Sequence, residues 1–344
     1  MKAYILPAFY KATALTVFGV FLFTCVDIFI KLLSPDFHVG QVLVVFGAGT
    51  AFIFWLMAFF LGQPLFDKQY LHKATLLRCV CEMIGGLALV FALANSALST
   101  VTAIMQAAPF VLTIMAVIFL KEKIGLQRII AILLGFIGVL IVIRPSLAGI
   151  DIYAIAALIG VIGLAGRDFS ARILPNRVSV IGLSFFGSLS VAFAGFLLIT
   201  LSGRWTVPDI QQTIYCIAMV MAGSLGLWCM SASIRLADVS AVSPFRYTRI
   251  VFGMITGIII FNETVDIFTA LGSIIIIGAG LYSWSRERRL MDIGKPTMDN
   301  RLCFRKLNKQ PLNLSEIAAR QTLPFCQSYF FVAGVSMMLR AEET

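Results

Sequence analysis

The stretch "SPFRYTRIVFGMITGIIIFNET" (residues 243–264) places two arginines, Arg246 and Arg249, inside an apolar run. Apolar sequence of this length is typical of a membrane span. A charged side chain at the centre of a bilayer costs about 2.5–3.5 kcal/mol on insertion scales, so it persists only beside a partner or a water-filled cavity. The stretch therefore predicts a membrane protein whose spans enclose a polar cavity.

The rest of the chain has the same apolar character. Of its 344 residues, 60% are hydrophobic and 13% are charged, and the mean hydropathy is +0.95. Soluble domains carry about 25% charged residues, so we expect an integral membrane protein. The net charge of +10 fits the basic loops of such a protein better than it fits a nucleic-acid surface.

Apolar stretches long enough to cross a bilayer as helices follow one another with short connections between them. No connection is long enough to hold a soluble catalytic domain, so we expect an all-α integral membrane protein of ten transmembrane helices. The expected spans are 12–31, 40–62, 75–95, 99–120, 126–143, 152–171, 180–201, 213–233, 239–261 and 267–285.

The basic residues predict the orientation of these spans. With the N-terminus in the cytoplasm, most Lys and Arg residues flank the cytoplasmic ends, and only Lys31, Arg144 and Arg204 flank the outer ends. This bias predicts a multi-pass protein of the cell inner (plasma) membrane with both termini in the cytoplasm.

The chain repeats itself when it is shifted by 141 residues. Each half then holds five helices, and because five is odd, the second half enters the membrane from the opposite side. Inverted repeats of this kind are frequent in secondary transporters, with the substrate site between the halves. We expect a first repeat at 1–145, a second at 146–289 and a central cavity between them. The coinciding residues are Gly19 with Gly160, Asp27 with Asp168, Lys31 with Arg172, Gly85 with Gly226, Ser99 with Ser240, and Glu122 with Glu263.

Two corresponding segments carry a resemblance to a known family. They read "STVTAIMQAAPFVLTIMAVIFLKEKIGLQRIIAILLGFIGVLIVIRP" (99–145) and "DVSAVSPFRYTRIVFGMITGIIIFNETVDIFTALGSIIIIGAGLYSWSRERR" (238–289). Each has an early Pro, an apolar run closed by Glu, and a Gly-containing helix. The chain is similar here to the drug/metabolite transporter superfamily, in its EamA-domain branch.

The resemblance covers about residues 10–289 and implies ten helices in two inverted halves around a central cavity. The segment "PFRYTRIVFG" (244–253) is similar to the sequence of a bacterial subgroup that includes riboflavin and S-adenosylmethionine uptake proteins. One departure is Lys121, which stands where the family usually has Gly. The tail at 290–344 matches nothing in the family; we expect it to be cytoplasmic and disordered, with a short apolar stretch at 323–339 suited to an interfacial helix.

Arg246 and Arg249 are the first candidates for substrate binding. Their spacing places both on one helix face, which we expect to line the cavity with Tyr247 beside them. Gln106 is the repeat counterpart of Tyr247 and is expected to face the same cavity. The arginines would meet an anionic or polar part of the substrate, and Tyr247 would stack on its ring; core packing is the alternative for the aromatic residue.

Glu82 in the third span is the expected carboxylate partner of Arg246, and Arg78, one turn before Glu82, is the alternative partner. The pair is interpreted either as a site released by substrate or by a proton, or as a static ion pair between helices. Glu122 and Glu263 lie at span ends beside loops, and we interpret them as packing or capping groups.

Asp27 and Asp168 form a symmetric pair near opposite ends of the bundle. Each has basic neighbours: Lys31 follows Asp27 by one turn, and Arg167 and Arg172 flank Asp168. One interpretation makes these clusters gates that close the two sides in turn. The other, which the sequence favours, is local pairing at helix ends, where charges reach the interface easily.

The sequence favours a secondary transporter of a small polar or aromatic metabolite. No zinc-protease, nucleophile-elbow or phosphate-loop motif occurs, so we expect no enzyme activity, cofactor or metal. An intramembrane enzyme and a channel are the alternatives from other classes. Riboflavin uptake is the leading hypothesis, with S-adenosylmethionine uptake and amino-acid or drug efflux as alternatives. The expected partners are a small-molecule substrate and membrane lipid, and we expect no nucleic acid. The sequence is compatible with both a monomer and a homodimer.

Overall fold

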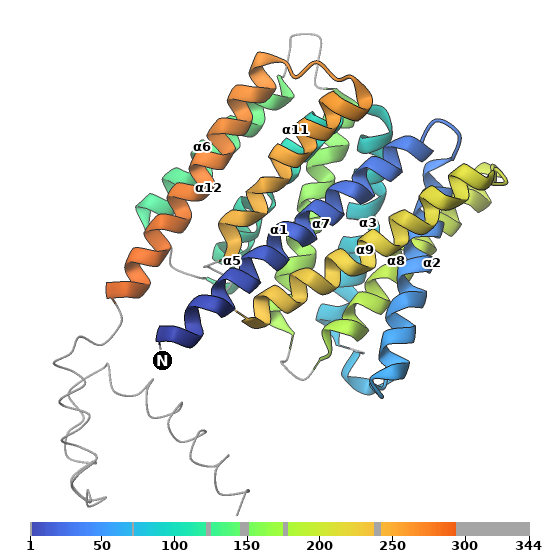
Figure 1. Ribbon diagram of the computed structural model, residues 1–344, viewed down its shortest axis with the longest axis horizontal. Coiled ribbons are helices and arrows are strands. Elements are labelled where there is room, and N and C mark those ends of the chain that lie inside the picture. The colour runs from blue at the N-terminus through green and yellow to red at the C-terminus, as the bar shows by residue number, and fades with distance from the viewer. Residues whose placement is uncertain are drawn as a thin grey trace, which may run out of the picture. The chain divides into compact units, whose positions relative to one another are not determined.

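A computed structural model describes residues 2–293 except 71, 122–124, 145–150, 175–177 and 237–241. Every regular element in this described part is a helix (Figure 1). The stretch at 323–339, like the rest of the tail from 294 onward, lies outside the described residues. The elements are α1 (Lys2–Leu33), α2 (Val39–Phe60), η1 (Lys68–Tyr70), α3 (Lys73–Asn95), α4 (Leu98–Met105), α5 (Ala108–Leu120), α6 (Leu126–Ile143), α7 (Ile152–Ile173), α8 (Val180–Ser202), α9 (Ile210–Leu236), η2 (Ser243–Tyr247), α11 (Thr248–Phe261) and α12 (Ile267–Ile293).

The expected spans correspond to these helices one by one. In the described part, 9 helical stretches are long and apolar enough to cross a membrane, with α4 and α5 together forming one of them. The remaining expected span is α6, which is a shorter apolar helix over Ile129–Ile143. The prediction of an all-α integral membrane protein is confirmed, because no soluble core could cover so many apolar helices.

The fourth and ninth spans are each interrupted at corresponding positions. The fourth changes from α4 to α5 at Gln106 and Ala107, and the ninth changes from η2 to α11 at Tyr247, the repeat counterpart of Gln106. Pro109 lies in the first turn of α5 and Pro244 in the first turn of η2, where a missing N–H costs no helical hydrogen bond. A break inside the membrane is tolerated where the freed backbone groups are buried in protein or line a cavity.

The two halves also end their broken spans in the same way. Lys121 after α5 and Asn262 after α11 are repeat counterparts, and both adopt the left-handed conformation, with φ of 54° and 51°. This conformation favours Gly, because it brings the Cβ of other residues too close to the backbone. The backbone at Lys121 thus has the left-handed geometry that favours Gly.

The helices of one half pack mainly on helices of the other half. Helix α1 lies along α9, and α3 lies along α7, which is the same interface under the repeat (Figure 1). Glycines allow both approaches: a Cβ at Gly226 would lie 3.3 Å from the Gly19 carbonyl oxygen, and one at Gly85 would lie 3.5 Å from the Gly160 oxygen. The repeat is therefore a structural symmetry, with α2 packed on its own counterpart α8.

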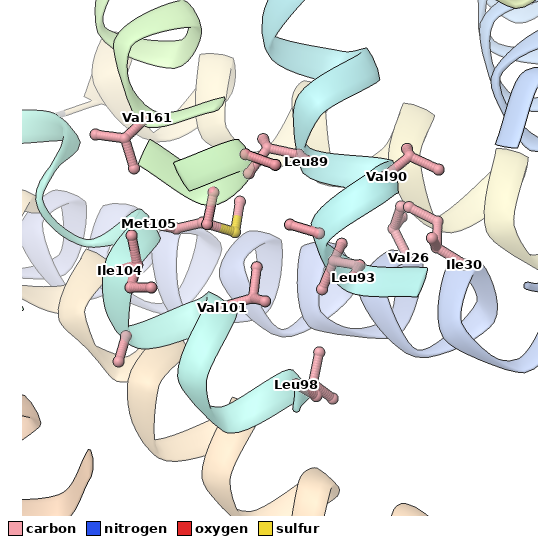
Figure 2. Close-up of a cluster of buried hydrophobic side chains, with 14 of the residues drawn as sticks. Val26, Ile30, Leu89, Val90, Leu93, Leu98, Val101, Ile104, Met105 and Val161 are labelled. Atoms are coloured by element: carbon pink, nitrogen blue, oxygen red, sulfur yellow. The ribbon is translucent and has the colours of Figure 1, made fainter. Parts of the chain in front are cut away.

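Apolar side chains of α1, α3, α4 and α7 form a close-packed cluster in this arrangement. Figure 2 shows the cluster, in which Met105 points among the side chains of the other helices. Six members from these four helices also line the central cavity, so the cluster is one wall of the candidate site. They are Val26, Ile30, Leu89, Val90, Leu93 and Met105.

Candidate functional site

A cavity of about 220 Å³ lies among the helices of both halves. Residues from α1, α2, α3, α4, α7, α8, α9, η2, α11 and the start of α5 line it. The wall is mainly apolar, but it holds four arginines and three carboxylates, so it carries one more positive than negative formal charge. The charged residues are Arg78, Arg167, Arg246, Arg249, Asp27, Glu82 and Asp168.

Arg249 forms a close ion pair with Asp27 across the repeat interface. The guanidinium Nη2 donates to Asp27 Oδ2 at 2.6 Å, and the side chains are 16% and 5% exposed. The Arg249 guanidinium also lies over the Phe23 ring, 5.8 Å from its centre. The pair joins α1 to α11 and leaves Asp27 almost inaccessible to solvent.

Asp168, the counterpart of Asp27, has a more open environment. Arg167 donates to Asp168 Oδ1 at 3.0 Å through Nε. The Arg246 guanidinium lies 3.7 Å from the other oxygen, Oδ2, and its side chain is 41% exposed. Both symmetric aspartates thus contact an arginine of the segment 246–249, but the contact at Asp168 is longer and more exposed to solvent.

The pair of Arg167 with Asp168 is the local pairing that the sequence suggested, but Asp27 has a different partner from the expected one. We expected Lys31 to neutralise Asp27. In the structure, Asp27 forms an ion pair with Arg249, and Lys31 forms one with Glu263. The physical reason is packing, because α1 contacts α11 and brings the arginine to the buried side of α1. The side chain of Arg172, the expected neighbour of Asp168, lies outside the described part of the chain.

Glu82 pairs with Arg78, the alternative to Arg246 as its expected partner. Arg78 donates to Glu82 Oε1 at 2.9 Å within α3, and both side chains line the cavity. A Cβ at Gly187 would collide with the Glu82 carboxylate, so the glycine on α8 makes room for the acid. The expected pairing of Glu82 with Arg246 is not present in this conformation.

Gln106 lies in the cavity wall, as expected, and ties the two broken spans together. Its Nε2 donates to the backbone carbonyl of Arg246 at 2.8 Å. Tyr247 does not line the cavity: it is buried, and its ring occupies the space where a Cβ at Gly280 would lie. The expectation that Tyr247 stacks on a substrate in this cavity therefore needs correction.

Lys31 and Glu263 form a second polar cluster near the end of α1. The Lys31 Nζ donates to Glu263 Oε1 at 2.5 Å and to the Ser96 carbonyl at 2.9 Å. Glu263 also accepts hydrogen bonds from the backbone N–H groups of Leu98 and Ser99, at 2.7 and 3.1 Å, and so caps the N-terminus of α4. The capping interpretation of Glu263 is confirmed, and Glu122 lies outside the described residues.

The charge state of this cluster follows from these contacts. Burial alone would raise the pKa of the Glu263 carboxyl, but the hydrogen bonds from Lys31 and from the α4 backbone outweigh burial and hold the pKa below its ordinary value of 4.5. Glu263 is therefore ionised at neutral pH, and it joins α1, α4 and the end of α11 by charge.

Arg167 is a site residue that the sequence reasoning treated only as a neighbour. Its counterpart in the first half is Val26, so the cation has no equivalent under the repeat. A cation within a membrane span, at a position that is apolar in the other half, is a signal that could have identified it.

These features define a class of protein. Two inverted five-helix repeats enclose a cavity with charges of both signs, and broken spans meet at that cavity, which is the architecture of secondary transporters. The model of the EamA-like transporter family matches residues 11–144 and again 151–284. The chain belongs to the EamA-like transporter family and is a multi-pass membrane transporter of a small molecule.

Related proteins have different named substrates. An S-adenosylmethionine uptake transporter of Rickettsia felis is 25% identical over 286 residues, which are 81% of this chain and 96% of the relative. A riboflavin transporter of Brucella anthropi is 26% identical over 198 residues, 56% of this chain and 69% of the relative. A solved crystal structure matches with a TM-score of 0.59 at 12% identity, covering 82% of this chain and 99% of the other, and indicates the fold alone.

Proposed function

We propose that the protein is a secondary transporter that moves a zwitterionic, amino-acid-bearing metabolite by alternating access, with S-adenosylmethionine uptake as the first candidate. The observation that carries the proposal is the presence of four arginines and three carboxylates in one apolar cavity. Charged groups are placed inside a membrane only where they are paired or where they serve transport. A substrate with charges of both signs can exchange with pairs of this kind.

S-adenosylmethionine fits this chemistry in each of its parts. Its carboxylate suits an arginine fork, and its ammonium and sulfonium groups suit the carboxylates of the wall. Its nucleoside suits the apolar wall that includes Phe23 and Phe46. Supporting the choice, a relative that spans 81% of this chain bears the name S-adenosylmethionine uptake transporter.

Riboflavin uptake is the second candidate, favoured by the relative named riboflavin transporter. Riboflavin is uncharged at neutral pH, so it would use none of the ion pairs in the wall. The aromatic residue expected to stack on a flavin, Tyr247, packs away from the cavity. The charge of the site therefore ranks riboflavin below a zwitterion.

Alternating access would use the symmetric interfaces between the halves. A cavity of about 220 Å³ is below the range of roughly 300–1,000 Å³ common for ligand pockets, so a nucleoside-sized substrate requires the halves to separate. The glycine contacts of α1 with α9 and of α3 with α7 suit small sliding motions. We propose the inner membrane as the location, with both termini cytoplasmic, and with a monomer or a homodimer as the unit.

Uptake by the purified protein in proteoliposomes tests the proposal. We expect saturable entry of labelled S-adenosylmethionine, acceleration by unlabelled compound on the opposite side, and recovery of the compound chemically unchanged. Arg204→Gln, at an exposed loop arginine, serves as the matched control and should transport at the wild-type rate. Flux that never saturates would indicate a channel, a changed product would indicate an enzyme, and uptake of riboflavin alone would select the second candidate.

A further inference from the structure

The contact between Arg246 and Asp168 is the loosest ion pair in the cavity wall. Its atoms are 3.7 Å apart, against 2.6 Å for Arg249 with Asp27 and 2.9 Å for Arg78 with Glu82. At 41% exposure, the Arg246 side chain is also the most accessible of these groups. A long, exposed pair contributes little binding energy, so its two members are available to a third group.

The two oxygens of Asp168 have different partners. Oδ1 accepts from Arg167 at 3.0 Å, and this contact keeps the carboxylate in place. Oδ2 has only the long contact with Arg246 among the ion pairs of the described part of the chain. One oxygen of the carboxylate is thus held by Arg167, while the other has a long contact with the more exposed Arg246, which also lines the cavity.

The Arg246 side chain can leave Asp168 without moving its backbone. Gln106 holds the Arg246 carbonyl at 2.8 Å, and this hydrogen bond does not involve the guanidinium. Two half-helices, α5 and α11, also begin beside the cavity, and their N-terminal dipole ends add positive potential where Arg246 lies. The segment therefore offers a movable cation on a fixed backbone.

We propose that the head group of the substrate inserts between Arg246 and Asp168. Its carboxylate binds the Arg246 guanidinium, and its ammonium donates to Asp168 Oδ2. The Arg249–Asp27 pair does not contact the head group and is a positioning pair that fixes the start of α11 against α1. This inference rests on the proposed function and narrows it, because it assigns selectivity to one of two arginines a single turn apart.

The test compares two labelled probes in proteoliposomes, S-adenosylmethionine and its decarboxylated derivative, which lacks only the carboxylate. We expect Arg246→Gln to raise the KM for S-adenosylmethionine roughly 10–100-fold, the range for loss of a charged hydrogen bond. The KM for the decarboxylated derivative should stay near its wild-type value. Asp168→Asn should raise the KM for both probes, because both carry the ammonium.

Three further measurements keep the result clear. Arg249→Lys should lower the maximal rate but leave the ratio of the two KM values unchanged, as expected of a positioning residue. The exposed Arg204→Gln should change neither. Because the ratio compares probes in one preparation, it does not depend on how much protein folds, and Arg246→Lys, which keeps the charge without the fork, should give an intermediate ratio.

Two outcomes would overturn the inference in distinguishable ways. An equal rise of both KM values in Arg246→Gln would place the carboxylate elsewhere, while the proposed function would stand. Absence of saturable uptake of both probes by the wild-type protein would remove the proposed function and this inference with it.

Discussion

Asp27 and Asp168 occupy the same position in the two halves, yet their surroundings differ. Asp27 is 5% exposed and closed by one arginine at 2.6 Å, whereas Asp168 is 28% exposed and shared between Arg167 and Arg246. Arg246 and Arg249 both belong to the second half, so the Arg249–Asp27 pair joins the two halves, whereas the Arg246–Asp168 contact lies within the second half. Their counterparts in the first half are Met105 and Ala108. The packing of the helices follows the repeat while the charges do not, and we propose that the binding chemistry lies where the charges differ.

Removing the charge of each aspartate in turn is the most direct test of the difference between Asp27 and Asp168. We expect Asp27→Asn to lose about 3–5 kcal/mol of stability and most transport, because it leaves Arg249 buried without a partner. Asp168→Asn should lose about 1 kcal/mol or less, because its partners are more exposed. Thermal unfolding of the purified variants in detergent, followed by uptake assays, measures both effects.

A double variant provides the control for that experiment. Replacing both members of the sealed pair, Asp27→Leu with Arg249→Met, should recover most of the lost stability, because a buried ion pair and an apolar pair are often equivalent. Transport need not return with it, since α11 would then lack its charged anchor. Equal stability of Asp27→Asn and the wild-type protein would show that the pair is not sealed.

The glycine interfaces offer a second comparison between the halves. A Cβ at Gly163 on α7 would lie 2.5 Å from the Gly85 Cα on α3, whereas one at Gly226 would lie 3.3 Å from the Gly19 oxygen. We expect Gly163→Ala to lose about 1–3 kcal/mol, because two backbones must separate. Gly226→Ala should lose much less. Melting temperatures compare the two, and equal losses would mean that both interfaces relax equally.

Much of this architecture was predictable from the sequence, for a physical reason. Span positions depend on local hydropathy, and the repeat depends on coincidences such as Asp27 with Asp168, so neither requires knowledge of packing. Ion-pair partners are different, because Asp27 and Arg249 are 222 residues apart and meet only when α1 packs on α11. The nearer base, Lys31, was the natural prediction, and only the fold could redirect it to Glu263.

The prediction that Tyr247 lines the cavity also differs from the structure for a specific reason. The spacing of Arg246 and Arg249 places them on one helix face, but Tyr247 follows Arg246 directly, and consecutive residues of a helix point to different sides. The 3₁₀ helix η2 (Ser243–Tyr247) keeps this arrangement, because residues three apart in it point to the same side. Both arginines therefore line the cavity, while the Tyr247 ring lies toward α12, where Gly280 gives it space.

The ion pair between Lys31 and Glu263 can be tested by changing the pH. Because its folded-state pKa lies below the ordinary value of 4.5, the carboxylate stabilises the fold above that value. The stabilisation is lost as the pH falls through the lowered pKa. Glu263→Gln should cost about 1.5 kcal/mol at neutral pH, where it removes the charged contact with Lys31. The melting temperatures of the two proteins should then converge in acid, and a constant gap would contradict this role.

The smallest expected effect compares the two left-handed helix ends. Lys121 and Asn262 are repeat counterparts with φ of 54° and 51°. Lys pays the full steric penalty of this conformation, whereas Asn tolerates it better because its short side chain bonds locally. Lys121→Gly should therefore stabilise the protein by about 0.5–1 kcal/mol, and Asn262→Gly should change it by a few tenths at most. A rise in melting temperature for both variants alike would mean that the two ends are strained equally, and that the asymmetry between the halves is confined to their charges.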